Sequence, residues 1–265
     1  MGIKALSLAN ETLSGMIDVC VDALRRGPVH SKHVLDVSRS YRRLGCGMLL
    51  ASHGATRFFF CLHLAADAWL QYLERKHLWP DADVYYLARA RAEPILDAVA
   101  LGNTELVRNL DERMEPQWHE GMEYEEDYCY FTLLPRLLSP ATPHEELFAL
   151  LDRMEGALEG ASHPRCDALK ALLQGDSKRF DEALRALIDA WNADAERERR
   201  GGQGNAFALA TEAQVFIEGI ALVRVARARG LSTRALYPLI PTPALGEPQA
   251  GMKREPIWGT EPLPK

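Results

Sequence analysis

The chain has 265 residues, of which 47% are hydrophobic and 26% charged, and its formal net charge is −6. This length allows one large domain or two small ones with a sizeable core. The acidic balance argues against a nucleic-acid-binding protein, which would show a basic face, and suits a basic protein partner instead.

Hydrophobic residues at helical spacing predict helices through most of the first half of the chain. The expected helices span residues 5–26, 31–51, 55–79, 84–99 (interrupted or started afresh at Pro94) and 104–114. Residues 55–79 are apolar on most sides, which predicts a buried helix near the centre of the domain. Gly45 and Gly47 weaken the prediction for residues 31–51.

The second half continues in the same way. We expect a short helix or turn over residues 128–138 broken by Pro135, then helices over 144–159, from Pro164 to the turn at 174–177, and from there to about 198. After a loop at 200–205, residues 206–229 predict one strong final helix capped by Gly230. No region alternates polar and apolar residues, so the fold class is all-α.

Two segments share the plan of a helix, a glycine turn and a second helix. They are ILDAVALGNTELVRNL and LKALLQGDSKRFDEAL, with Gly102 and Gly175 at the turns. This pattern indicates either repeated αα-hairpins or two independent ones. The architecture is therefore an antiparallel helical bundle or an irregular array of αα-hairpins.

The last part of the chain changes character, because seven of the 15 prolines lie between Pro238 and Pro264. We expect a single all-α domain over residues 1–237 and a Pro-rich extended tail over 238–265. Side chains at 237, 239, 240 and 245 are expected to pack on the domain. Trp258 either docks as well or lies in a partly disordered tail.

The five cysteines are odd in number and include no C-x-x-C pair: Cys20, Cys46, Cys61, Cys129 and Cys166. They predict reduced thiols and no zinc site. The N-terminal segment lacks the order of a signal peptide, and no apolar run approaches the length of a membrane span. We expect a cytoplasmic protein without membrane contact.

Residues 111–131, DERMEPQWHEGMEYEEDYCYF, form the most unusual stretch of the chain, with eight carboxylates between positions 111 and 127. Acids interleaved with aromatic residues offer steering charge and anchoring side chains to a partner. The predicted partner-binding residues are Glu115, Trp118, Glu120, Glu123, Tyr124, Glu125, Glu126 and Asp127. A solvated acidic helix end explains the pattern equally well. A metal site is less favoured, because the order of a calcium-binding loop is missing.

Other candidate sites are weaker. His63 and Asp67 stand four residues apart, as a catalytic pair would, but a buried core histidine is the favoured interpretation. Three groups of arginines, at 39–43, 197–200 and 224–229, are the main support for nucleic-acid binding, although such groups are usually solvated helix faces. We therefore predict no catalytic residues, no metal and no cofactor.

Three segments of the second half resemble the Imm49 family of bacterial polymorphic-toxin immunity proteins. They are EYEEDYCYFTLL at 123–134, CDALKALLQGDSKRFDEALRALI at 166–188 and EGIALVRVARARGLSTRALYPLIPTPAL at 218–245. The resemblance implies a cytoplasmic antidote, encoded beside a secreted toxin that contact-dependent or type VI machinery delivers between bacteria.

Such an antidote binds the cognate toxin domain, often a nuclease, and blocks it as a monomer or homodimer. The resemblance transfers no catalytic residue to this chain. Two alternatives stay open at this point: a helical-repeat scaffold that binds a protein partner unrelated to toxins, and an α-helical enzyme that uses His63 and Asp67.

Overall fold

The protein is described by a computed structural model, which covers residues 3–27, 29–51, 54–79, 83–202, 204–248, 252, 256 and 257. These residues form helices and connecting turns, and the only β feature among them is an isolated antiparallel bridge between Tyr237 and Ile240. The all-α prediction is confirmed.

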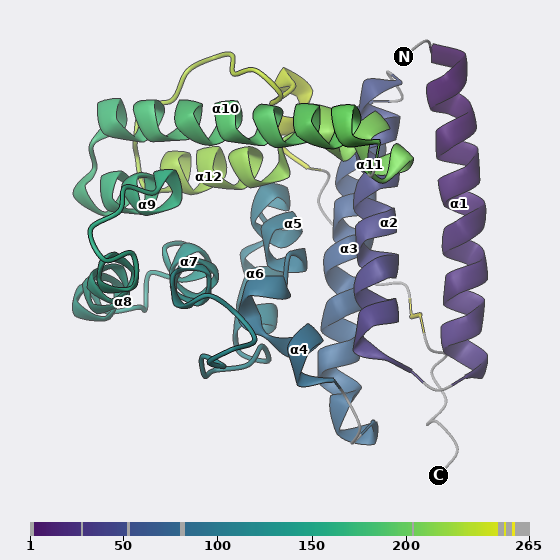
Figure 1. Cartoon of the computed structure of the whole chain (residues 1–265), viewed down its shortest axis with the longest axis horizontal. Helices are drawn as coiled ribbons and strands as arrows, with labels where there is room; N and C mark the ends of the chain where they lie inside the picture. The colour runs from purple at the N-terminus through teal and green to yellow at the C-terminus, as the bar shows by residue number, and fades with distance from the viewer. Residues whose placement is uncertain are drawn as a thin grey trace.

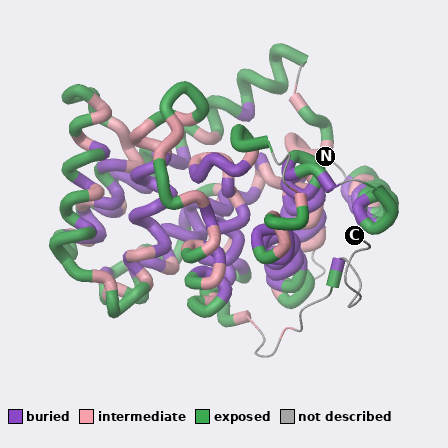
Figure 2. The backbone as a smooth tube through the Cα atoms, turned by 90° about the horizontal axis from the view of Figure 1, so that it is seen from below, coloured by how far each residue is buried: buried purple, intermediate pink, exposed green. Residues whose placement is uncertain are grey.

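Three long antiparallel helices form one side of the molecule (Figure 1): α1 (Ile3–Arg26), α2 (Ser31–Leu50) and α3 (Ala55–Arg75), with a short 3₁₀ turn η1 (Lys76–Leu78) after them. Helix α2 packs against both α1 and α3. Helix α3 is buried over nearly its whole length, as its apolar sequence predicts. The buried segments lie in the middle of the molecule in Figure 2, with exposed segments around them.

Gly45 and Gly47 lie within α2 in spite of their poor helix propensity, because the neighbouring chain comes close at both positions. A Cβ atom on Gly45 would lie 2.8 Å from Cβ of Cys61 on α3, and one on Gly47 would collide with the side chain of Asn10 on α1. These two glycines therefore allow α2 to pack tightly on both sides.

The middle of the chain forms α4 (Val84–Leu87), the 3₁₀ turn η2 (Arg89–Arg91), α5 (Pro94–Leu101) and α6 (Thr104–Asp111). The predicted helix over 84–99 does start afresh at Pro94, which occupies the first turn of α5. Helix α5 packs against α3 and against the last long helix, α12, and so joins the two halves of the molecule.

The second half forms α7 (Glu125–Arg136), α8 (His144–Ala157), α9 (Pro164–Gln174) and α10 (Ser177–Gly201). Helix α7 begins three residues before the prediction and includes Pro135. Its first turn holds three acids, which the positive end of the helix dipole favours, and Pro135 lies in the last turn, where the helix is about to end.

The prediction of one helix over 206–229 is wrong. The chain forms α11 (Ala206–Ala210), the 3₁₀ turn η3 (Glu212–Gln214) and α12 (Ile217–Ala228) instead. The backbone N–H of Phe216 donates to the carbonyl of Leu239 at 2.7 Å, so this break is stabilised by the C-terminal segment. Gly230 follows α12 with a φ of 79°, as expected for a capping glycine.

By length and composition, the same stretch, Ala206–Ala228, could cross a membrane, contrary to the expectation that no apolar run approaches that length. However, 61% of its most apolar window is buried inside the protein, and the chain breaks twice within it. Packing in the core therefore accounts for its apolar character.

The start of the proline-rich tail packs on the helices, as predicted. Tyr237, Ile240 and Leu245 are buried, Leu239 is partly buried against the same core, and a 3₁₀ turn η4 (Thr242–Leu245) follows. Ile257 is buried further on. Trp258 lies outside the described residues.

Candidate functional site

The acidic and aromatic stretch forms the connection between α6 and α7 together with the first turn of α7. Its aromatic residues divide into two groups. Tyr128 and Tyr130 are buried, and Trp118 packs partly buried against the core, whereas Tyr124 is 74% exposed. Most aromatic side chains of the stretch therefore pack into the core, and Tyr124 is the one that is exposed to solvent.

The start of this connection is fastened to the helices beneath it. The carboxylate of Glu115 accepts from Nζ of Lys76 at 2.8 Å, and its backbone carbonyl accepts from Nη1 of Arg89 at 3.2 Å. The hydroxyl of Tyr128 donates to the carbonyl of Pro116 at 2.7 Å. Glu115 is therefore part of the support of the loop.

The middle of the connection is closed by Trp118 and Glu123. Nε1 of Trp118 donates to the carbonyl of Glu123 at 3.1 Å. The carboxylate of Glu123 accepts from the backbone N–H of Ala90 at 2.8 Å and from that of His119 at 3.3 Å. Both predicted residues thus fix the shape of the loop, which sequence alone did not indicate.

Two further acids of the stretch pair with arginines. Nε of Arg153 on α8 donates to Glu125 at 2.6 Å, and Nη1 of Arg165 on α9 donates to Asp127 at 2.7 Å. The guanidinium of Arg153 also lies 5.9 Å from the ring centre of Trp118. Much of the negative charge of the stretch is therefore balanced from within.

Glu120, Met122 and Tyr124 are exposed, and Glu126 is half-buried. Among the described residues, Glu120 and Glu126 have no hydrogen bond or ion pair. We call residues 118–126 the acidic knob. Gly121 has a φ of 79° and turns the chain at its tip.

Arg91 connects the knob to Tyr85 on α4 through a cation–π contact and a hydrogen bond. The guanidinium of Arg91 lies 3.6 Å from the ring centre of Tyr85, and its Nη2 donates to the carbonyl of Met122 at 3.4 Å. Tyr85 and Met122 are both exposed. An exposed tyrosine and an exposed methionine therefore border the free acids.

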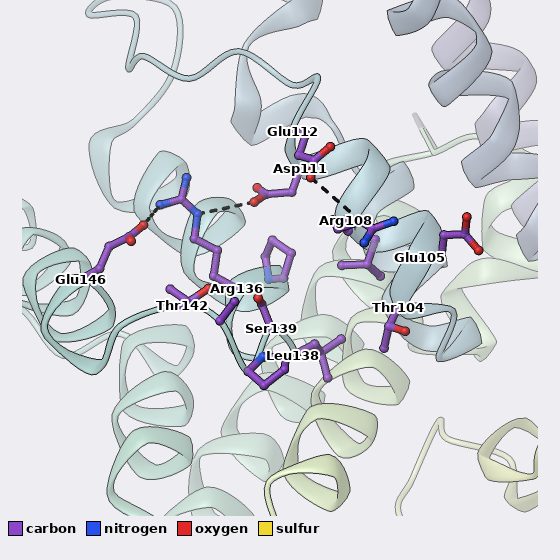
Figure 3. Close-up of a pocket in the computed structure, with 14 residues that line it drawn as sticks. Thr104, Glu105, Arg108, Asp111, Glu112, Arg136, Leu138, Ser139, Thr142 and Glu146 are labelled. Atoms are coloured by element: carbon purple, nitrogen blue, oxygen red, sulfur yellow. Dashed lines mark hydrogen bonds and ion pairs between the residues drawn. The ribbon is translucent and has the colours of Figure 1, made fainter.

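A groove of about 770 Å³ lies between α6 and the connection from α7 to α8 (Figure 3). Arg136 spans it, with Nε 3.5 Å from Asp111 on α6 and with a close contact to Glu146 on α8. The charged residues of its lining are four acids and two arginines: Glu105, Asp111, Glu112, Glu146, Arg108 and Arg136. The groove is thus acidic, and it begins where the acidic stretch begins.

A second cleft, of about 340 Å³, lies where the two halves of the molecule meet. We call it the ionic cleft. Its lining is Arg42, Ala90, Glu93, Leu96, Asp127, Phe131, Arg165, Trp191, Glu212, Val215, Ile217 and Glu218. It therefore collects side chains from α2, α5, α7, α9, α10 and α12.

On one side of the ionic cleft, Arg165 makes three charged hydrogen bonds. Nε and Nη2 donate to the two oxygens of Glu218 at 2.7 and 2.9 Å, and Nη1 donates to Asp127. Burial alone would lower the pKa of Arg165, but these carboxylates raise it well above its ordinary value. Arg165 therefore stays charged.

On the other side, Arg42 binds both oxygens of Asp97 at 2.7 Å and one oxygen of Glu93 at 2.9 Å. Burial raises the pKa of Asp97 to about 6 in spite of these bonds. The pKa of Glu93 falls to about 2, because the attraction of Arg42 and Arg39 outweighs the effect of burial. This cluster ties α2 to α5.

The ionic cleft was not predictable from the sequence. Arg42 and Asp97 are 55 residues apart in the chain, and Arg165 and Glu218 are 53 apart. No local spacing relates such pairs. The only signal was the group of arginines around Arg42, which the sequence alone favoured as a solvated face.

His63 and Asp67 are both buried on α3. The ring nitrogens of His63 have no hydrogen-bond partner among the described residues, and Oδ2 of Asp67 accepts from Gln71 on the same helix at 2.6 Å. His63 is therefore buried in the core, as predicted, but the hydrogen bonds expected for a satisfied core histidine are missing among the described residues.

The cysteines are free thiols. Burial raises the pKa of Cys61 to about 12 and that of Cys129 to about 11, with Glu125 and Glu126 adding to the effect at Cys129. Both are therefore poor nucleophiles. Within the described part of the chain, no group of three or more His, Cys, Asp or Glu side chains is arranged to hold a metal ion.

A comparison with known proteins matches the chain to a protein family. The family model described as Immunity protein 49 matches residues 22–244, which include α2 to α12 and most of η4. No curated protein and no solved structure matches the chain. The matched segment contains the acidic knob, the groove and the ionic cleft. The chain belongs to the Immunity protein 49 family, which indicates a role in immunity to a toxin.

Proposed function

We propose that this protein binds the toxin domain encoded beside it through the acidic knob and so covers the functional surface of that toxin. It acts in the cytoplasm by binding and not by catalysis, as a monomer or homodimer, without nucleic acid or membrane. Membership of the immunity family supports the toxin as partner, and the geometry of the knob supports the surface.

The observation that carries the proposal is the exposure of Tyr124 between two free acids. Tyrosine is among the residues that contribute most to binding at protein interfaces. Glu120 and Glu126 flank it without internal partners in the described part of the chain, so binding would not break an existing ion pair there. A partner would contact an exposed tyrosine that is flanked by two negatively charged side chains.

The knob is also rigid before binding. The bonds from Trp118, Ala90 and His119 to Glu123 close the loop from inside. A loop that is already ordered loses little conformational entropy on association, which leaves more of the contact energy for affinity. The buried residues of the stretch thereby hold the exposed residues in place for binding.

The charge of this surface fits a toxin with a basic face. Nucleases bind phosphates with lysine and arginine, and a carboxylate-rich surface can occupy the same positions. The acidic groove beside the knob extends the negative field, which speeds the encounter with a basic partner. A nuclease is therefore the class of toxin that we propose.

The test measures affinity for the product of the adjacent gene as a function of salt. Y124A should weaken binding at least tenfold, because a buried aromatic anchor contributes about 2 kcal/mol or more. L236A is the matched control, since Leu236 is 72% exposed in the C-terminal segment. Binding by Y124A that equals binding by L236A would place the interface elsewhere.

Charge is tested separately with the double variant E120K/E126K. It should slow association and flatten the dependence on salt. E182K/D189K, on the exposed face of α10, makes the same change in net charge away from the knob. Reversal at Glu123, Glu125 or Asp127 is a poorer test, because these acids support the loop or pair with arginines.

A wild-type protein that binds no product of the adjacent gene at low salt would contradict the proposal. It would then favour the helical scaffold that binds an unrelated protein. Tight binding whose affinity does not depend on salt would support the toxin as partner but would place the interface on apolar surface instead of the acidic knob.

A further inference from the structure

The ionic cleft lies directly beside the acidic knob. Asp127, one of its lining residues, follows the knob in the sequence. Ala90, another, donates its backbone N–H to Glu123 of the knob at 2.8 Å. A partner that covers the knob would therefore stand at the mouth of the cleft.

The cleft and the groups bonded to it carry an excess of negative charge. Five carboxylates (Glu93, Asp97, Asp127, Glu212 and Glu218) face four guanidinium groups (Arg39, Arg42, Arg43 and Arg165). The excess lies on the side of Arg165, because this one arginine serves both Asp127 and Glu218. One further cation would balance the cluster.

Two carboxylates of the lining keep an unused oxygen. Asp127 accepts from Arg165 through Oδ1 only. Glu212 accepts both bonds from Arg43 through Oε1, and its buried Oε2 has no donor in the described part of the chain. A buried carboxylate oxygen without a donor is costly, so an incoming donor gains stability there.

The two arginines of the cleft, in contrast, are already occupied. Nε and both terminal nitrogens of Arg42 donate to carboxylates, and so do those of Arg165. An anion would be repelled by the excess of carboxylates that surround these arginines. The chemistry of the cleft therefore selects a cation.

The shape of the cleft suits a long side chain. The side chains of Glu93 and Asp127 are 34% and 30% exposed and form the mouth, whereas those of Arg42 and Glu218 are 9% and 8% exposed and form the floor. Trp191 and Phe131 add aromatic surface, against which a guanidinium can stack. The volume of about 340 Å³ exceeds what one extended arginine or lysine requires.

We propose that the ionic cleft receives a single basic side chain, an arginine or a lysine, from the partner that covers the acidic knob. Asp127 and Glu212 bind its charged group and Trp191 covers its stem. This inference rests on the proposed function, because the partner supplies the side chain, and it names a second anchor beside Tyr124.

The first experiment probes the cleft without the toxin. N-acetylarginine amide is titrated into the full-length protein while the indole N–H resonance of Trp191 is followed, with W191F to assign it. The resonance should shift and saturate, whereas the neutral isostere N-acetylcitrulline amide should leave it unchanged. D127N and E212Q should each weaken the effect at least fivefold, and Y124A should not. An unmoved resonance would overturn the inference.

The second experiment uses the toxin domain. E212Q keeps an oxygen for Arg43 and removes the charge, so the fold should hold, and its affinity should fall at least tenfold. E155Q, in the exposed pair of Glu155 with Lys170, is the control. Equal affinity of E212Q and the wild type would overturn the inference, even where the arginine probe binds, because the toxin would then place no basic side chain against Glu212.

The two proposals fail in different ways. A wild-type protein that binds no toxin refutes the proposed function and the occupant together, and the arginine probe still shows whether the cleft selects a cation. If the toxin binds E212Q and the wild type equally but binds Y124A weakly, the acidic knob is supported as the interface and the proposed occupant of the ionic cleft is refuted.

Discussion

Arg42 and Asp97 show how much of this fold depends on single charged residues. Asp97 is fully buried on α5, and Arg42 on α2 binds both of its oxygens. Burial opposes each charge, and only the other charge, with Glu93, offsets that penalty. At the scale of the residue, the pair joins α2 to α5, and either charge would destabilise the fold if its partner were removed.

We expect R42M to lower the free energy of unfolding by about 3–5 kcal/mol, because it leaves a buried carboxylate without its partner. Burial raises the pKa of Asp97 and Arg42 lowers it, so the loss of Arg42 raises this pKa further in the folded variant. The folded variant then gains stability from the proton at pH 5, and the loss of stability should be larger at pH 8 than at pH 5. Urea denaturation at both pH values measures this.

The control for R42M is R108M, since the one ion pair of Arg108 within the described part of the chain is an exposed contact of 4.0 Å with Glu112. It should change the stability by less than about 0.5 kcal/mol. Equal effects of the two substitutions would show that the buried clamp contributes no more than a surface pair.

At the scale of the element, the two αα-hairpins, α5–α6 and α9–α10, are also shaped by a few residues. Each turn has a glycine with positive φ, Gly102 at 73° and Gly175 at 69°, which ends the first helix. The next residue then caps the second helix: Asn103 accepts from the N–H of Leu106, and Asp176 from that of Arg179. Both turns are thus set by local chemistry.

Replacing glycine by alanine should have opposite effects on stability at two positions, one in a turn and one within a helix. G175A forces a side chain into left-handed backbone and should cost about 1 kcal/mol or more. G15A, within α1 with open space around it, should stabilise by about 0.5–1 kcal/mol through better helix propensity. Thermal unfolding of both variants tests this, and a stabilising G175A would contradict the proposed turn.

At the scale of the whole molecule, the C-terminal segment reaches back to the first helix. Nε of Arg25 on α1 donates to the carbonyl of Ile257 at 2.6 Å, and the N–H of Ile257 donates to Gln71 on α3 at 2.9 Å. The side chain of Ile257 is buried. The segment therefore fastens α1 and α3 to one another from outside.

I257A and R25Q should each destabilise the protein by about 1–3 kcal/mol, through lost burial and a lost hydrogen bond. Because both release the same segment, the double variant should lose clearly less than the sum. L8A, at an exposed position of α1, should have little effect. Strict additivity in denaturant unfolding would show that the two contacts act independently.

The sequence by itself determined the helices and most of their ends. Hydrophobic spacing is local, and so are the signals at Pro94, Gly102, Asn103, Gly175 and Asp176, because they act through backbone conformation within one turn. The same holds for the acidic stretch, which was found from composition alone. These features need no knowledge of what packs against them.

Only the tertiary structure decided which of those residues are available to a partner. Contacts with Ala90 and Arg165 turned Glu123 and Asp127 into supporting groups. They left Glu120 and Tyr124 exposed and the half-buried Glu126 without a partner in the described part of the chain. The break at Phe216 has the same origin, because its partner is Leu239. Bonds between distant segments leave no periodic trace in a single sequence, and these bonds placed the charges of the ionic cleft.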